Sequence, residues 1–155
     1  MRVVNTEAFG RAEEARLVDR LRERARPYLG LVAVEGGEIV GHIVFAPVAL
    51  DAGGSTSTLM ALAPMAVRPG RQRRGIGSAL VRAGFDACRA AGHGVVIVVG
   101  HPAFYPRFGF VRARPLGLTS EPAFPDEAFM VAELEPGALR GRRGVVRYPA
   151  EYVEV

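Results

Sequence analysis

Residues 61–77 read ALAPMAVRPGRQRRGIG, an apolar run that passes into an arginine- and glycine-rich turn. Sequence with helical spacing follows at once, so the turn joins a strand to a helix. Gly75 and Gly77 let the backbone turn tightly and approach a ligand closely. The first N–H groups of the helix point toward the turn and have no partner within the helix. The stretch therefore predicts an anion-binding site.

Three arginines, Arg71, Arg73 and Arg74, add permanent positive charge beside those donors. Their number favours a ligand with two or three phosphates over a lone carboxylate. Three cations at a helix start also repel one another unless an anion lies among them. We therefore expect the turn to hold a pyrophosphate rather than to serve only as a connection.

The composition is that of a globular protein. The chain has 155 residues, and we expect a single domain over residues 1–155. Hydrophobic residues make up 49% and charged residues 23%, which excludes a disordered or fibrous chain. Cys88 is the only cysteine, so no intramolecular disulfide can form and a cytoplasmic location is expected. The longest apolar run, Val95–Val99, is too short to span a bilayer, so no membrane partner is expected.

The basic residues, 20 in all, are arginines, and they give a net charge of +4. The lack of lysine excludes a Schiff base, a lysine nucleophile and the lysine of a phosphate-binding P-loop. The arginines are scattered along the chain and form no continuous basic stripe, so a nucleic-acid partner is not expected.

The first half of the chain predicts a helix and a hairpin. Residues 11–25 carry apolar side chains at helical spacing and end at Pro27. Residues 31–34 and 39–45 flank a compact turn and predict an antiparallel hairpin. Pro47 is expected to interrupt the second strand near its end.

The central part predicts a strand–helix–strand unit. Pro64 lies within the strand at 58–67, and because proline cannot donate to a ladder, we expect a bulge or a local parting of strands there. The following helix, to Ala91, is expected to bury a face made largely of alanines: Ile76, Ala79, Leu80, Ala83, Ala87 and Ala91. The consecutive valines and isoleucine of 95–99 predict a strand buried on both faces and joined to 58–67 by a right-handed parallel crossover.

The last part predicts a short helical turn through Phe108, an extended segment at 110–113, a strand at 129–134 and a weak strand at 145–148. The fold class that follows is α/β (α+β), with a mixed, mostly antiparallel twisted sheet and one parallel crossover.

The sequence lacks residues that two other phosphate-binding motifs require. A P-loop needs lysine after its last glycine, where this chain has Ile76. A dinucleotide fingerprint needs a small residue at position 80, which is leucine, and an acidic residue farther on, where the next strand is wholly apolar. What remains is the Gln-x-x-Gly-x-Gly turn at 72–77, which with the downstream sequence resembles the acetyl-CoA signature of the GNAT N-acetyltransferase superfamily. Segments 100–110, 127–130 and 147–149 resemble its small bacterial YhbS-like branch.

The resemblance implies acetyl-CoA as co-substrate, no metal, and transfer of the acetyl group to a primary amine of a small molecule or protein by direct attack. It implies that the backbone N–H groups of the turn residues hold the pyrophosphate: Gln72, Arg73, Arg74, Gly75, Ile76, Gly77 and Ser78. It further implies that Met65, Ala66 and Val67 bind the pantetheine arm like an added strand, with a backbone N–H near Val67 as the oxyanion donor.

By the same resemblance Tyr105 is the general acid for the departing thiolate, and a phenol with pKa near 10 suits that role. The alternative is that Tyr105 only packs in an aromatic cluster with neighbouring phenylalanines. His101 is a candidate base. It can equally hydrogen-bond the loop or the pantetheine, with water relaying the proton.

The start of the chain departs from the resemblance. Val3–Gly10 resembles only the end of the family's first helix, so we expect the fold to lack the first strand and part of that helix. Either the true start lies upstream, or Leu31–Val34 lies closer to the sheet edge, which favours a homodimer.

Three functions are therefore open: the N-acetyltransferase, a non-catalytic acyl-CoA-binding sensor or interaction module, and a basic nucleic-acid-binding module. The last is disfavoured because no surface pattern of aromatic and basic residues is present.

Overall fold

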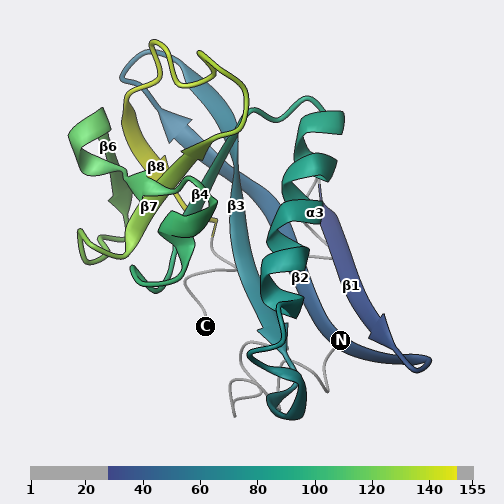
Figure 1. The fold of residues 1–155 in the computed structure, drawn as a ribbon. Helices are drawn as coiled ribbons and strands as arrows, with labels where there is room; N and C mark the ends of the chain where they lie inside the picture. The colour runs from purple at the N-terminus through teal and green to yellow at the C-terminus, as the bar shows by residue number, and fades with distance from the viewer. Residues whose placement is uncertain (1–27, 150–155) are drawn as a thin grey trace.

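The computed structural model describes residues 28–149, whose strands form an eight-stranded sheet with helix α3 across one face (Figure 1). The strand order is β5-β7-β4-β3-β2-β8-β6, and β1 also pairs with β2. The strands are β1 Leu29–Glu35, β2 Glu38–Asp51, β3 Thr56–Val67, β4 Val95–Val99, β5 Val111–Arg112, β6 Leu118–Glu121, β7 Phe129–Glu133 and β8 Gly144–Arg147. The helix α3 spans Ile76–Ala90, and the 3-10 turns are η1 Pro69–Arg71, η2 Tyr105–Phe108 and η3 Arg114–Leu116. The helix predicted at 11–25 and the segment 3–10 lie outside the described residues.

The predicted hairpin is confirmed as β1 and β2, which pair antiparallel. The prediction that Pro47 interrupts the second strand is wrong, because β2 continues to Asp51. On that side of β2, pairing with β1 ends at Phe45 and pairing with β8 begins at Ala49. Pro47 lies between them, where no neighbouring strand requires its missing N–H.

The bulge predicted at Pro64 is confirmed. Ile43 pairs with Met65 and Phe45 pairs with Leu62, so β3 has one residue more than β2 in this interval. The parallel crossover is also confirmed, because β3 and β4 pair in parallel with α3 between them. A second parallel pair, β6 with β8, was not predicted, and neither was β6 itself.

Two hydrophobic clusters lie on the two faces of the sheet. In β4, Val96 and Val98 belong to the cluster beneath α3, while Val95 and Ile97 belong to the other cluster. The predicted buried face of α3 is wrong in part: Leu80 is buried and Ile76 and Ala87 are partly buried, but Ala79, Ala83 and Ala91 are exposed. Besides Leu80, the helix buries larger apolar side chains outside the predicted face, because these remove more apolar surface from water: Val81, Phe85 and Cys88, together with Gly84.

Candidate active site

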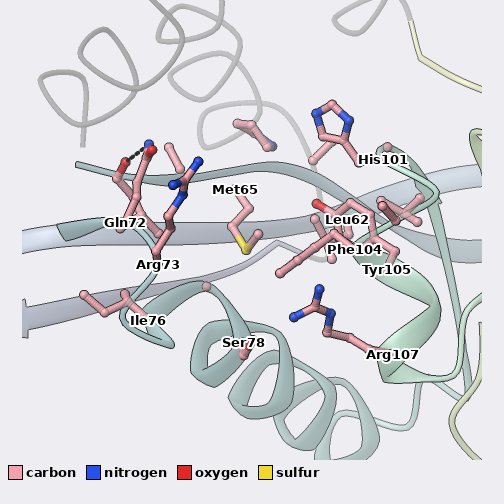
Figure 2. Close-up of a pocket in the computed structure, with 18 of the residues that line it drawn as sticks. Leu62, Met65, Gln72, Arg73, Ile76, Ser78, His101, Phe104, Tyr105 and Arg107 are labelled. Atoms are coloured by element: carbon pink, nitrogen blue, oxygen red, sulfur yellow. Dashed lines mark hydrogen bonds between the residues drawn. The ribbon is translucent and has the colours of Figure 1, made fainter. Parts of the chain in front are cut away.

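The site begins where β3 and β4 part. Their pairing extends only to Leu62 and Val98, yet β3 continues along β2 to Val67. A cavity of about 1100 Å³ opens in this wedge, bordered by the turn before α3 on one side and by η2 on the other (Figure 2). The cavity brings together all the predicted site residues except Arg74: Met65, Ala66, Val67, Gln72, Arg73, Gly75, Ile76, Gly77, Ser78, His101 and Tyr105.

The edge of β3 presents backbone groups to the wedge. The Arg68 N–H donates to the Val40 carbonyl at 2.8 Å, which orients Arg68 toward β2. Because orientation alternates along a strand, Met65 and Val67 face the opposite edge, toward the cavity. In agreement, the Val67 carbonyl accepts a hydrogen bond from the Gln72 side-chain amide at 2.9 Å. The backbone groups of Ala66 face β2, so the predicted added-strand pairing falls to Met65 and Val67 alone.

The first turn of α3 has N–H donors without a partner in the helix. Gly75 stands at its N-cap with φ of 81°, a conformation that glycine adopts without strain, and it offers no side-chain cap. The first helical bond runs from the Ala79 N–H to the Gly75 carbonyl, so the preceding N–H groups, from Ile76 to Ser78, have no helical partner. No acidic residue lies in this turn. Such a helix start suits an anion.

The turn arginines are held by an acid from the hairpin. Glu35 accepts Arg71 Nε at 2.7 Å and approaches Arg74 Nη1 at 3.4 Å. The Arg74 guanidinium turns to Glu35 and lies outside the cavity lining, so any contact of Arg74 with a ligand falls to its backbone N–H. The argument that crowded arginines need an external anion loses force for Arg71 and Arg74, because Glu35 supplies negative charge to both, but no acidic side chain of residues 28–149 pairs with Arg73.

Tyr105 lies at the other end of the cavity and is largely buried. Its ring packs edge-on against Phe104 and Phe110, at centroid distances of 5.1 and 5.6 Å. A Cβ at Gly100 would lie only 2.3 Å from Tyr105 Cε2, so the ring sits directly on the glycine backbone. Burial raises the pKa of Tyr105 to about 12, above the ordinary phenol value on which the sequence argument relied. The phenol is thus neutral at physiological pH.

His101 lines the cavity but is exposed. Figure 2 shows its imidazole directed away from Phe104 and Tyr105. Its backbone carbonyl accepts the N–H groups of both residues, at 3.1 and 3.3 Å, and so anchors the start of η2. These are backbone contacts, so the role of the imidazole, as a base or as a partner of the loop or the pantetheine, stays a prediction.

Sequence reasoning missed Phe104 and Arg107 as cavity residues. The Arg107 guanidinium lies over the Phe104 ring at 4.9 Å from its centroid. Their spacing of three residues within segment 100–110 could have indicated this contact, since residues so spaced meet on one side of a helical turn. The cavity lining contains Arg71, Arg73 and Arg107 and no carboxylate from the described residues.

Within residues 28–149, no cluster of three or more His, Cys, Asp or Glu side chains is arranged to hold a metal ion. None of the helices in this range is long and apolar enough to cross a membrane.

The sequence matches the family model of an acetyltransferase (GNAT) domain over residues 3–113. It is 36% identical over 142 residues to the uncharacterized N-acetyltransferase YhbS of Escherichia coli K12, covering 91% of this chain and 84% of the relative. It is 42% identical over 112 residues to the uncharacterized N-acetyltransferase YjhQ of the same organism, covering 71% of this chain and 62% of that relative.

Two solved structures resemble the fold closely. The crystal structure of YhbS from Escherichia coli in complex with CoA aligns with a TM-score of 0.87 at 33% identity, covering 98% of this chain and 84% of that one. A GNAT acetyltransferase from Brucella melitensis in complex with acetyl-CoA aligns with a TM-score of 0.77 at 32% identity, covering 97% and 88%. With its parted strands, its glycine turn and these relatives, the chain belongs to the GNAT acetyltransferase family.

Proposed function

We propose that this protein transfers an acetyl group from acetyl-CoA to a primary amine of a small molecule or a protein. One observation carries the proposal: an open strand edge, an uncapped helix start and a neutral phenol border the same cavity. The CoA and acetyl-CoA complexes of the two relatives support it. On this proposal the chain acts as a single domain.

The cavity residues fit coenzyme A. The N–H groups of Ile76, Gly77 and Ser78 would receive the diphosphate, with Arg73 beside them. Hydrogen bonds to a charged group contribute about 1.5–3 kcal/mol each, so a few suffice to anchor the molecule. The exposed backbone groups of Met65 would pair with the amides of the pantetheine arm, as a strand pairs with a sheet edge, because the Val67 carbonyl already accepts the Gln72 amide.

The chemistry needs few protein groups. The amine nitrogen attacks the thioester carbonyl, the carbon–sulfur bond breaks, the amine loses a proton and the sulfur gains one. The Val67 N–H faces the wedge and would stabilise the oxygen that becomes negative. Tyr105 would donate its phenolic proton, or a hydrogen bond, to the departing sulfur. Because its pKa is about 12, the phenol is available in its protonated form throughout the neutral range.

The general base is the catalytic group for which the described cavity lining offers no carboxylate. The described lining contains no carboxylate, so the amine proton passes to His101 or to water. Since the imidazole points away from Tyr105, we favour a relay through water (Figure 2).

A screen of amines with acetyl-CoA, read out as free thiol, tests the proposal. Binding of CoA is measured in parallel as a shift of the melting temperature. We expect CoA to stabilise the fold and at least one amine to release thiol. Stabilisation without release by any amine would favour the non-catalytic binding module, and absence of both would refute CoA recognition altogether.

A further inference from the structure

Arg107 differs from Arg71 and Arg74 in how it is held. Among residues 28–149, no acidic side chain forms an ion pair with it. Instead its guanidinium lies on the face of Phe104, whose ring packs against Phe108 at 5.1 Å and against Tyr105. Stacking fixes a guanidinium by its face and leaves the N–H donors at its edge free. Arg107 is thus a pre-positioned cation that no acidic side chain of the described residues neutralises.

The stack places Arg107 beside the anion-binding helix start. A Cβ at Gly77 would lie 3.7 Å from Phe104 Cζ, so the ring that supports Arg107 borders the first turn of α3. Figure 2 shows the Arg107 side chain extending from η2 toward that turn, near Ser78 and across the cavity from Arg73. The guanidinium therefore lies on a ring that borders the first turn of α3, and it faces that turn from a different loop.

The identity of the ligand group follows if coenzyme A binds as proposed above. Besides its diphosphate, coenzyme A has one other phosphate, a monoester on the 3′-hydroxyl of the adjoining ribose. A phosphate monoester carries a charge of about −1.5 to −2 at pH 7. Its oxygens match the forked donors of arginine. We propose that Arg107 is a specificity-determining residue that receives this 3′-phosphate and makes the protein discriminate against 3′-dephospho-coenzyme A.

Arg82 provides a matched control on the same surface. It lies on α3, its guanidinium stacks on Phe108 at 5.5 Å from the ring centroid, and it is exposed. Unlike Arg107, it does not line the cavity. Replacing either arginine by glutamine removes one charge and one aromatic stack, so the pair separates a local contact from a general electrostatic effect.

The experiment measures dissociation constants of CoA and 3′-dephospho-CoA by calorimetry for the wild type, Arg107→Gln and Arg82→Gln. We expect the wild type to prefer CoA by about tenfold, the value of one charge-assisted contact at an exposed site. Arg107→Gln should reduce this ratio to about one by weakening CoA alone, and Arg107→Lys should restore part of it. Arg82→Gln should leave the ratio unchanged. Melting temperatures without ligand verify that each variant is folded.

Other results would overturn the inference. Equal affinities of the wild type for the two ligands would refute it while leaving CoA binding intact. Equal weakening of both ligands by Arg107→Gln would assign Arg107 to the diphosphate. An unchanged ratio of the two dissociation constants in Arg107→Gln would mean that Arg107 does not contact the 3′-phosphate. Loss of the preference for CoA in Arg82→Gln as well would mean that the preference comes from the net charge of the protein. No binding of either ligand to the wild type would instead be a failure of the proposed function.

Discussion

The turn at residues 68–75 and the segment at residues 100–109 border the same cavity from opposite ends, and both carry arginines. In the turn, Arg71 and Arg74 are held by Glu35, an acid from the distant hairpin. In the second segment, Arg107 is held by an aromatic ring three residues away. The first arrangement satisfies charge with charge, whereas the second orients a charge and leaves it available. The number of arginines alone therefore does not determine how much positive charge is available to a bound ligand.

The largest effect is expected at the aromatic end. Tyr105→Phe removes the phenolic proton but keeps the ring on Gly100, so we expect kcat to fall about 100-fold with little change in KM for acetyl-CoA. Steady-state kinetics with an accepted amine measures this. Tyr148→Phe is the control, because Tyr148 is a partly buried tyrosine that packs against a phenylalanine, at 5.3 Å, but lies outside the cavity. Full activity of Tyr105→Phe would leave Tyr105 a packing residue only.

Alanine substitutions of one glycine at each end of the cavity compare how closely neighbouring atoms pack against that glycine. A Cβ at Gly100 would overlap Tyr105, so Gly100→Ala should displace the ring, destabilise the fold by about 1–3 kcal/mol and lower kcat about tenfold. At the turn, a Cβ at Gly70 meets nothing within 4 Å, so Gly70→Ala should change neither quantity. Chemical denaturation and kinetics of the two variants test this. Equal behaviour of the pair would mean that Tyr105 does not depend on its contact with Gly100.

The same contrast explains what the sequence could reveal. The glycine turn, the bulge at Pro64 and the aromatic segment were all predicted. Each depends on residues that are adjacent in the sequence, so the local backbone geometry determines it. The capture of Arg71 and Arg74 by Glu35 joins residues 36 and 39 positions apart, and no local pattern indicates such a pair. The expectation that all three arginine side chains of the turn await an external anion overlooked Glu35 for this reason.

Two fold errors have similar causes. β6 is only four residues long, follows Gly117 and depends on pairing with β8, so its stability is set by a distant neighbour rather than by its own sequence. The face of α3 was misjudged because alanines occur on several sides of the helix. The larger apolar residues, such as Phe85, decide which side is buried.

Replacing Glu35 tests whether its ion pairs with the turn arginines reduce the positive charge available to CoA. Glu35→Gln frees Arg71, which already lines the cavity, so we expect CoA to bind about threefold more tightly, while unfolding free energy falls by less than about 1 kcal/mol. Calorimetry at low and high salt measures this, and the gain should shrink with salt. Glu38→Gln is the matched control, because Glu38 pairs with Arg68 at 3.7 Å outside the cavity lining. Weaker CoA binding in Glu35→Gln would mean instead that Glu35 orients Arg71 for the ligand.

The smallest effect concerns pH. Burial raises the pKa of Tyr105 to about 12, against about 10 for a solvated phenol, so folding favours the neutral form. The resulting stabilisation is complete below pH 10 and is lost as the pH rises through about 12. We therefore expect no loss of the Tyr105 contribution to kcat between pH 7 and pH 10. An ultraviolet difference titration of the wild type against Tyr105→Phe should show one tyrosinate forming near pH 12. Formation near pH 10 would mean that water reaches the phenol, and the proton donor would then be the ordinary tyrosine that the sequence suggested.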